Sequence, residues 1–301
     1  YLYFTAGDKS KERAKIWASE IVDIVSEYGK GNKRLALDHC TPEGIHELQS
    51  HGLELANGEE VMELARQIKS DDEMKAMRRS IFSCEKSMQL MRNHFKPGIT
   101  EQELWSRFQM EAVSRGAEWI ETRLLASGPR ANPWYQECSS RPILSGELMG
   151  FDTDLVGSYG YCTDMSRTWL CGDEKPTDEQ KEIYTMGYEQ IQNNMELLKP
   201  GTTFKELTLN AKEYSKDEFR HYSVLFHGVG LCDEFPAIPF SWELDENSFE
   251  GVLKAGMVMC VETYVGRYSG GPGVKLEEQV LITNNGYELL TSYPFESDLL
   301  L

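Results

Sequence analysis

The stretch FDTDLVGSYGYCTD, residues 151–164, decides the fold. Its two ends are apolar or β-prone and its middle holds turn residues, which predicts a β-hairpin. Asp154 and Asp164 are placed symmetrically about Tyr159. In a hairpin folded there, the two carboxylates are cross-strand neighbours on one face, close enough to share a cation.

A second hairpin is predicted nearer the C-terminus. Residues 257–265 and 275–282 have the composition of strands, and they flank the turn run Ser269-Gly270-Gly271-Pro272-Gly273. Glu262 and Glu277 are nearly equidistant from that turn. A buried pair of like charges would repel, so the pair suggests a cation that neutralises it.

A histidine between the two hairpins completes a set of potential metal ligands. The set occurs in the order Asp154, Asp164, His227, Glu262 and Glu277. Oxygen-rich ligation with one imidazole suits Mn, Fe, Co or Zn, whereas a structural zinc site prefers cysteine. A two-metal active site is therefore the leading interpretation. The alternative is that the acids are solvated on the open faces of the hairpins, but their order and symmetry favour the metal site.

The ligand order and the sequence around it resemble the pita-bread enzymes: methionine aminopeptidase, prolidase, aminopeptidase P and creatinase. The resemblance runs from about Arg66 to the C-terminus and includes residues 164–168 (DMSRT), 227–231 (HGVGL) and 275–280 (KLEEQV). It implies an α+β pita-bread fold over residues 67–301, with two metal ions bridged by a water or hydroxide at the five positions. Metal-free members of this fold have lost these ligands, whereas all five are present here.

An internal repeat supports the same fold. Residues 96–104 (KPGITEQEL) recur as residues 199–207 (KPGTTFKEL). In each copy Pro and Gly end one helix, and Thr with Glu three residues later predicts a capping box that begins the next. The repeat indicates two related halves about a pseudo-twofold axis. The alternative is independent use of a common helix boundary.

Residues 1–66 precede this region. We expect helices over residues 9–28, 41–51 and 59–66 and a strand over 34–38. This segment resembles the back portion of the small N-terminal domain of creatinase and prolidase, and its incompleteness suggests that an upstream segment is missing.

Composition limits the possible partners. The 301 residues can bury a sizeable core, and 49 acidic against 31 basic residues give a net charge of -18. Such a field disfavours nucleic acid and anionic membranes and favours a cationic or zwitterionic ligand. The 7 cysteines are scattered without a Cys-x-x-Cys pair, as in a reducing compartment. No apolar run is long enough for a membrane span and no signal peptide is evident, so a cytoplasmic location is expected.

Two positions separate this chain from the peptidases that it resembles. After Ser127-Gly128-Pro129 the peptidases carry Pro-His-Tyr, whereas this chain carries Pro133-Trp134-Tyr135. The peptidases also have a His-Glu pair shortly after the ligand histidine, where this chain has Asp233-Glu234. In that family the two imidazoles hold the scissile amide and its tetrahedral intermediate. Their absence beside a complete ligand set argues against amide hydrolysis.

Asp152 is a further departure. It lies two residues before Asp154 and therefore on the same strand face. We expect Asp152 to be a sixth metal ligand. The alternative is a carboxylate that only hydrogen-bonds to a ligand.

With these departures, the chain resembles the pita-bread dimethylsulfoniopropionate lyases of the DddP type. The resemblance implies that a metal-bound carboxylate acidifies the adjacent C–H, that Asp233 takes the proton, and that dimethyl sulfide leaves as acrylate forms. Tyr222 is the competing candidate for the base. Trp134, Tyr135 and Tyr222 are expected to form an aromatic wall for the sulfonium, although each could instead be a core residue.

The cofactor expected from this resemblance is a pair of metal ions, iron being favoured over Mn, Co and Zn. The expected partners are a small zwitterionic substrate and a second copy of the chain in a homodimer, with no nucleic acid and no membrane. Two other functions stay open. One is an X-Pro aminopeptidase or dipeptidase, and the other is a non-catalytic metal-binding partner protein, which would leave Asp233 and Trp134 without a purpose.

Overall fold

The structure, a computed structural model, describes residues 1–245 and 250–301. Contacts divide the chain into two units, Tyr1–Arg66 and Gln67–Leu301. The first unit contains α1 (Tyr3–Ala6), α2 (Ser10–Tyr28), β1 (Arg34–Leu37), α3 (Pro42–Ser50), β2 (Glu54–Asn57) and α4 (Gly58–Arg66). Strands β1 and β2 pair in parallel, and Ala18, Leu48 and Leu53 form the centre of its small core. The expected helices and strand are confirmed to within one or two residues.

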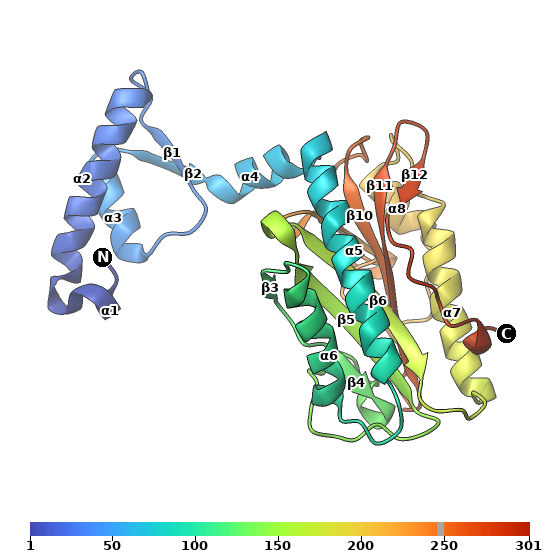
Figure 1. Ribbon diagram of the computed structural model, residues 1–301. Helices are drawn as coiled ribbons and strands as arrows, with labels where there is room; N and C mark the ends of the chain where they lie inside the picture. The colour runs from blue at the N-terminus through green and yellow to red at the C-terminus, as the bar shows by residue number, and fades with distance from the viewer. Residues whose placement is uncertain (246–249) are drawn as a thin grey trace. The chain divides into compact units, whose positions relative to one another are not determined.

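The second unit contains four helices and ten strands among the described residues (Figure 1). The helices are α5 (Asp71–His94), α6 (Glu101–Ser114), α7 (Asp178–Met195) and α8 (Phe204–Asn210). The strands are β3 (Trp119–Ile120), β4 (Leu125–Ser127), β5 (Leu148–Val156), β6 (Cys162–Leu170), β7 (Phe219–Arg220), β8 (Phe226–Val229), β9 (Asp233–Ile238), β10 (Val258–Arg267), β11 (Gly273–Ile282) and β12 (Tyr287–Leu289).

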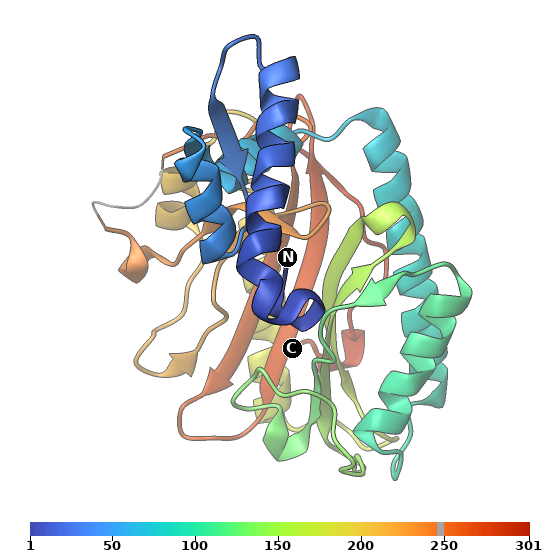
Figure 2. The same cartoon turned by 90° about the vertical axis from the view of Figure 1, so that its left-hand side faces the viewer.

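The strands form two sheets whose longest members are the two predicted hairpins. One sheet has the order β3-β5-β4, with β6 paired to β5, and the other has the order β12-β11-β10-β8-β9, with β7 paired to β10. The hairpins β5-β6 and β10-β11 lie side by side, with β11 in contact with β5 and β6 (Figure 2). Helices α5 and α6 pack on the first sheet and α7 packs on β10 and β11. The helices therefore cover the apolar faces of the two hairpins, opposite to the faces that carry the acids.

The internal repeat is confirmed by matching caps and matching contacts. Thr100 caps α6 through a capping box with Glu103, and Thr203 caps α8 through a capping box with Glu206. Each threonine also forms an isolated antiparallel bridge with the segment that leads into its hairpin, Thr100 with Pro142 and Thr203 with Val252. Helix boundaries that arose independently would not repeat this long-range contact. The two halves therefore have the same local structure at these positions, as an internal repeat predicts.

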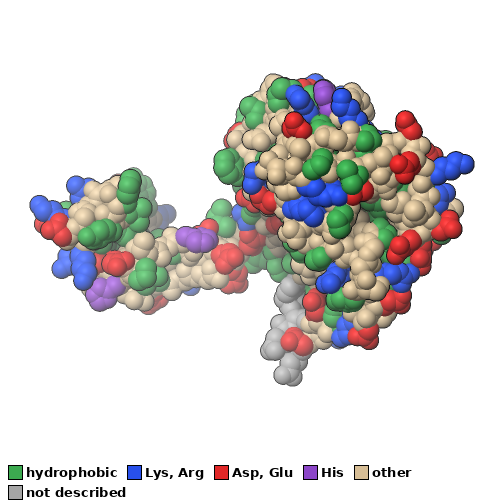
Figure 3. All heavy atoms as spheres, turned by 90° about the horizontal axis from the view of Figure 1, so that it is seen from below, with side chains coloured by type: hydrophobic (Ala, Val, Ile, Leu, Met, Phe, Trp, Pro, Cys, Tyr) green, Lys and Arg blue, Asp and Glu red, His purple; other side chains and the backbone are tan. Residues whose placement is uncertain are grey.

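No helix in the described part of the chain has the length and apolar character needed to span a membrane. On the face shown in Figure 3, acidic side chains are scattered and interspersed with lysines and arginines. The acidic side chains visible on that face are therefore not gathered into one patch.

Candidate metal centre and active site

Five carboxylates converge from the two hairpins. Asp154 is the cross-strand partner of Asp164, and Glu262 is the partner of Glu277, in the registers that the sequence predicts. Asp152 lies on the same face of β5, opposite Ser166. Four of the five acids are buried, since Asp152, Asp164, Glu262 and Glu277 are 2%, 5%, 1% and 0% exposed. Solvated carboxylates on open hairpin faces are thereby excluded for these four.

The imidazole of His227 lies at the centre of this cluster. Its Nε2 is 3.5 Å from Asp164 Oδ2, 3.3 Å from Glu262 Oε1 and 3.5 Å from Glu277 Oε1. Its Nδ1 lies 3.0 Å from the carbonyl oxygen of Gly228, which suits an N–H at that nitrogen. One nitrogen therefore faces three carboxylates from both hairpins. An ion coordinated by these groups would occupy the space between them.

The buried acids are electrostatically unfavourable by themselves. Burial, with the nearby charge of Asp152, raises the pKa of Asp154 to about 7. Burial also raises the pKa of Glu262 to about 8, although Lys275 opposes that rise. Among the described residues, Asp164 Oδ1, both carboxylate oxygens of Glu262 and Glu277 Oε1 have no hydrogen-bond partner. Such oxygens normally have partners, so bound cations fit this donor set well.

Two further side chains lie against the cluster of five acids and His227, which we call the cage. Neither of them was predicted from the sequence. Lys275 is fully buried, and its Nζ lies 3.0 Å from both Glu262 Oε2 and Glu277 Oε2 and 3.4 Å from Asp152 Oδ2. Cys260 is the cross-strand partner of His227 and joins Asp164, His227 and Glu277 in a cluster that could hold a metal ion. Cys260 lies two residues before Glu262 and Lys275 lies two residues before Glu277, and both glutamates are candidate ligands. The two-residue period of a strand was the available signal.

Asp233 also lies at the edge of the cage. A carboxylate oxygen of Asp233 lies within 4.8 Å of oxygens of Asp154 and Asp164, a second group that could hold a metal ion. Its Oδ1 is 3.7 Å from His227 Nδ1, and its side chain is 65% exposed. A β-bulge between His227 and Gly228 shifts the register of β8 and β9, which carries Asp233. Asp233 is thus the site carboxylate most open to an incoming molecule.

The three aromatic candidates divide into two kinds. Trp134 is only 5% exposed, stacks on Tyr264 at 6.0 Å between ring centroids, and lies so close to Gly150 that a Cβ there would collide with its ring. Tyr135 is 53% exposed and stacks on Tyr222 at 5.4 Å and 22°. Trp134 and Tyr222 belong to one cluster. Tyr135 is therefore the member that faces solvent, and Tyr222 and Trp134 lie behind it.

Tyr222 connects the wall to the cage. Its ring centroid lies 4.2 Å from Lys275 Nζ. Burial, with the nearby charges of Glu262 and Asp152, raises the pKa of the Tyr222 phenol well above its usual value. The phenol is accordingly held neutral in this environment.

The model of metallopeptidase family M24 matches residues 75–284. The chain belongs to this family. The predicted pita-bread fold is confirmed by this match and by the structure of the Xaa-Pro dipeptidase from Bacillus anthracis. That structure superposes with a TM-score of 0.80 at 26% identity, over 93% of this chain and 77% of the dipeptidase.

Two curated relatives extend over almost the whole chain. The dimethylsulfoniopropionate lyase DddP of Roseovarius nubinhibens is 43% identical over 99% of this chain and 68% of its own length. The DddP of Roseobacter denitrificans is 44% identical over 99% of this chain and 68% of its own length. The predicted resemblance to the lyase type is confirmed. The individual roles of the site residues stay predictions.

Proposed function

We propose that this protein is a metal-dependent lyase that cleaves dimethylsulfoniopropionate to dimethyl sulfide and acrylate. The observation that carries the proposal is the 43% to 44% identity to two such lyases over nearly the full chain. The site is consistent with it, because a partly exposed carboxylate, Asp233, stands beside a buried set of potential ligands.

We assign the ligand set as Asp152, Asp154, Asp164, His227, Glu262 and Glu277, which would hold two ions, iron being favoured. The four oxygens of Asp164, Glu262 and Glu277 that have no hydrogen-bond partner support this assignment. Bound ions would supply Lewis acidity toward the substrate carboxylate and so favour loss of the adjacent proton. Cys260 adds a soft donor at the same cluster.

The remaining chemistry belongs to side chains of this chain. Asp233 accepts the proton from the carbon next to the substrate carboxylate. The electron pair of that C–H bond forms the new C=C bond, and the C–S pair leaves with sulfur as dimethyl sulfide. Tyr135 presents an exposed ring that attracts the sulfonium, an interaction worth about 0.5 to 2 kcal/mol, and Tyr222 supports that ring by stacking on it. Trp134 supports Tyr222 from behind through their shared cluster.

The assignment of Asp233 over Tyr222 as base rests on exposure and charge. The Asp233 side chain is 65% exposed and can meet a substrate. The Tyr222 phenol, in contrast, is surrounded by acids that oppose its ionisation. Burial raises the pKa of the Asp233 carboxyl above its usual value, which makes its carboxylate a stronger proton acceptor.

The direct test is to incubate the iron-loaded protein with dimethylsulfoniopropionate and to measure dimethyl sulfide in the headspace and acrylate in solution. The two products should form in equal amounts. Asp164→Ala and Glu277→Ala should lower metal loading by elemental analysis and abolish product. A metal-free wild-type protein with full activity would overturn the assignment.

A second candidate function is hydrolysis of X-Pro peptides, which the similarity to a solved Xaa-Pro dipeptidase favours. Trp134 and Asp233 occupy the two positions where the peptidases carry imidazoles, and neither provides a neutral imidazole donor at pH 7. We therefore rank this function second. We also propose that the molecule is a homodimer and that residues 1–66 belong to an N-terminal unit of the creatinase and prolidase type.

A further inference from the structure

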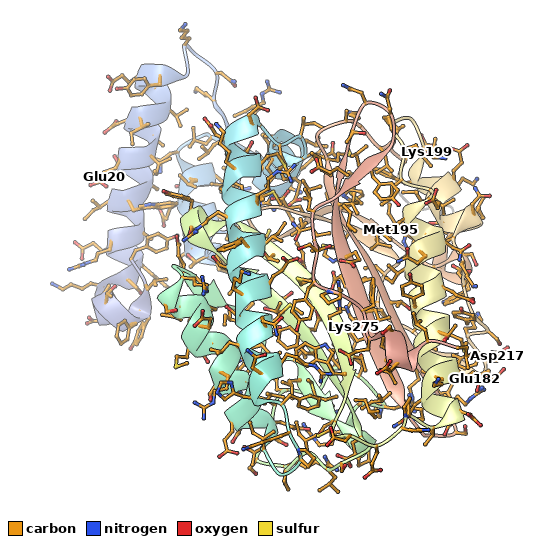
Figure 4. The ribbon with its side chains drawn as sticks, turned by 45° about the vertical axis from the view of Figure 1, so that its right-hand side comes forward. Glu20, Glu182, Met195, Lys199, Asp217 and Lys275 are labelled. Carbon is orange, nitrogen blue, oxygen red and sulfur yellow. The ribbon has the colours of Figure 1, made fainter. Side chains whose placement is uncertain are left out.

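Lys275 is a buried cation inside a cage of acids. It lies in the interior of the second unit on β11 (Figure 4), and its side chain is 0% exposed. Lysine usually keeps its ammonium in water while its stem covers apolar surface. Here the ammonium is buried together with its stem. A site for a fixed positive charge is therefore built into the fold.

The ammonium of Lys275 lies close to four polar side chains. Lys275 Nζ donates to Ser166 Oγ at 2.6 Å and to Glu277 Oε2 at 3.0 Å. It also lies 3.0 Å from Glu262 Oε2 and 3.4 Å from Asp152 Oδ2. Two of the three N–H groups of the ammonium are thus donated to Ser166 and Glu277, and Glu262 and Asp152 are the acids nearest to the third. A role as substrate anchor is thereby disfavoured.

His227 and Lys275 contact different carboxylate oxygens of Glu262 and Glu277. Glu277 turns Oε1 toward His227 and Oε2 toward Lys275, and Glu262 does the same. Bridging carboxylates in a two-metal centre share their oxygens between two cations in this way. Lys275 thus lies where its charge acts directly on any ion held by Asp152, Glu262 and Glu277.

We propose that Lys275 is an internal counter-cation that shares the oxygens of Asp152, Glu262 and Glu277 with a metal ion, stabilising the metal-free fold and limiting the affinity for that ion. The inference rests on the two-metal centre of the proposed function. Without the ammonium, three buried acids lose their nearest positive charge, which destabilises the empty cage. With a divalent ion present, the same ammonium repels that ion at close range.

The proposed role of Lys275 differs from simple packing in its effects on the metal-free and the metal-loaded protein. A lysine that only fills space or orients ligands would stabilise the metal-free and metal-loaded forms alike, or would strengthen metal binding. A counter-cation stabilises the metal-free form most and weakens binding. Removal of its charge should therefore increase metal affinity.

The experiment compares Lys275→Met, Lys275→Arg and Lys199→Met in the full chain. Methionine matches the length of the lysine stem without the charge, and arginine keeps the charge. Lys199 is exposed at the outer edge of the unit beyond α7 (Figure 4), so its replacement controls for loss of a positive charge in general. Each protein is stripped with chelator and titrated with Mn²⁺ by calorimetry, and its melting temperature is measured with and without Mn²⁺.

In Lys275→Met we expect the melting temperature of the metal-free form to fall much more than that of the Mn²⁺-loaded form. The weaker of the two Mn²⁺ ions should bind at least about tenfold tighter, the effect of one fixed charge at short range. Lys275→Arg and Lys199→Met should keep the wild-type affinities. Equal losses of melting temperature in both forms, or weaker Mn²⁺ binding, would overturn the proposal.

Failure of Lys275→Met to fold is also informative. We expect soluble protein when Mn²⁺ is present during refolding, and insolubility with and without Mn²⁺ would count against the proposal. None of these measurements uses substrate. A protein that shows the expected binding pattern but forms no dimethyl sulfide would refute the lyase function and leave the role of Lys275 standing.

Discussion

Replacement of Lys69 by methionine tests how the turn before Asp233 is held. Lys69 Nζ lies 2.5 Å from Glu234 Oε2, and the two side chains are 2% and 1% exposed. Glu234 Oε1 accepts a hydrogen bond from Leu231 N at 2.8 Å. A Cβ on Gly230 would collide with the Glu234 carboxylate, so the turn lies directly against it. Glu234 therefore connects the ammonium to the turn that places Asp233.

The size of the effect follows from this burial. Removal of one partner from a buried ion pair costs about 3 to 5 kcal/mol. In a unit of about 235 residues, Gln67–Leu301, each kcal/mol lowers the melting temperature by about 2 to 4 °C, so Lys69→Met should lose about 10 °C. The kcat for dimethyl sulfide formation should fall as well, because the base is less well positioned.

Scanning calorimetry and headspace kinetics measure the two effects. The matched control is Lys75→Met, since Lys75 Nζ lies 2.7 Å from Asp72 Oδ1 but the side chains are 76% and 90% exposed. That exposed pair should contribute less than about 0.5 kcal/mol. Glu234→Gln should reproduce the losses of Lys69→Met. If Lys69→Met melts and turns over like Lys75→Met, the buried pair does not hold the turn.

Four other predictions concern the site itself. Asp233→Asn should lose about 10²- to 10⁴-fold in lyase rate while it keeps metal by elemental analysis; near-normal activity here with an inactive Tyr222→Phe would make the tyrosine the base. In chelated protein, stability should fall as pH rises from about 4, the ordinary pKa of a carboxyl group, to about 8. Burial raises the pKa of Asp154 to about 7 and of Glu262 to about 8, so over this range the folded state holds protons that the unfolded state has released. Melting temperatures that stay level or increase over this range would contradict this prediction. Tyr135→Ala should raise KM by about 2- to 30-fold through loss of a sulfonium contact, and an unchanged KM would exclude this residue from the wall. X-Pro dipeptides and tripeptides with Mn, Co or Fe should show no enzyme-like turnover by chromatography, and efficient cleavage of any of them would place the peptidase function first.

Local features of this protein were determined by its sequence. Turn residues centred on Tyr159 set the register that pairs Asp154 with Asp164, and the capping boxes at Thr100 and Thr203 begin the helices where expected. These features depend on interactions within a few residues, and their propensities and spacing are visible in the chain. The candidate ligands predicted from the sequence also lie together in the folded chain, because each hairpin presents its acids on one face.

Other features were decided only by tertiary packing. Trp134 and Tyr135 are adjacent, yet Trp134 is buried against Gly150 and Tyr135, with a φ of 66°, turns toward solvent. The ammonium of Lys275 lies among the acids because β11 lies beside β5 and β6, a contact between segments about a hundred residues apart. Local propensity assigns a lysine on a strand to the surface. Its burial is stabilised only where the acids of both hairpins surround it, and that arrangement exists only in the folded chain.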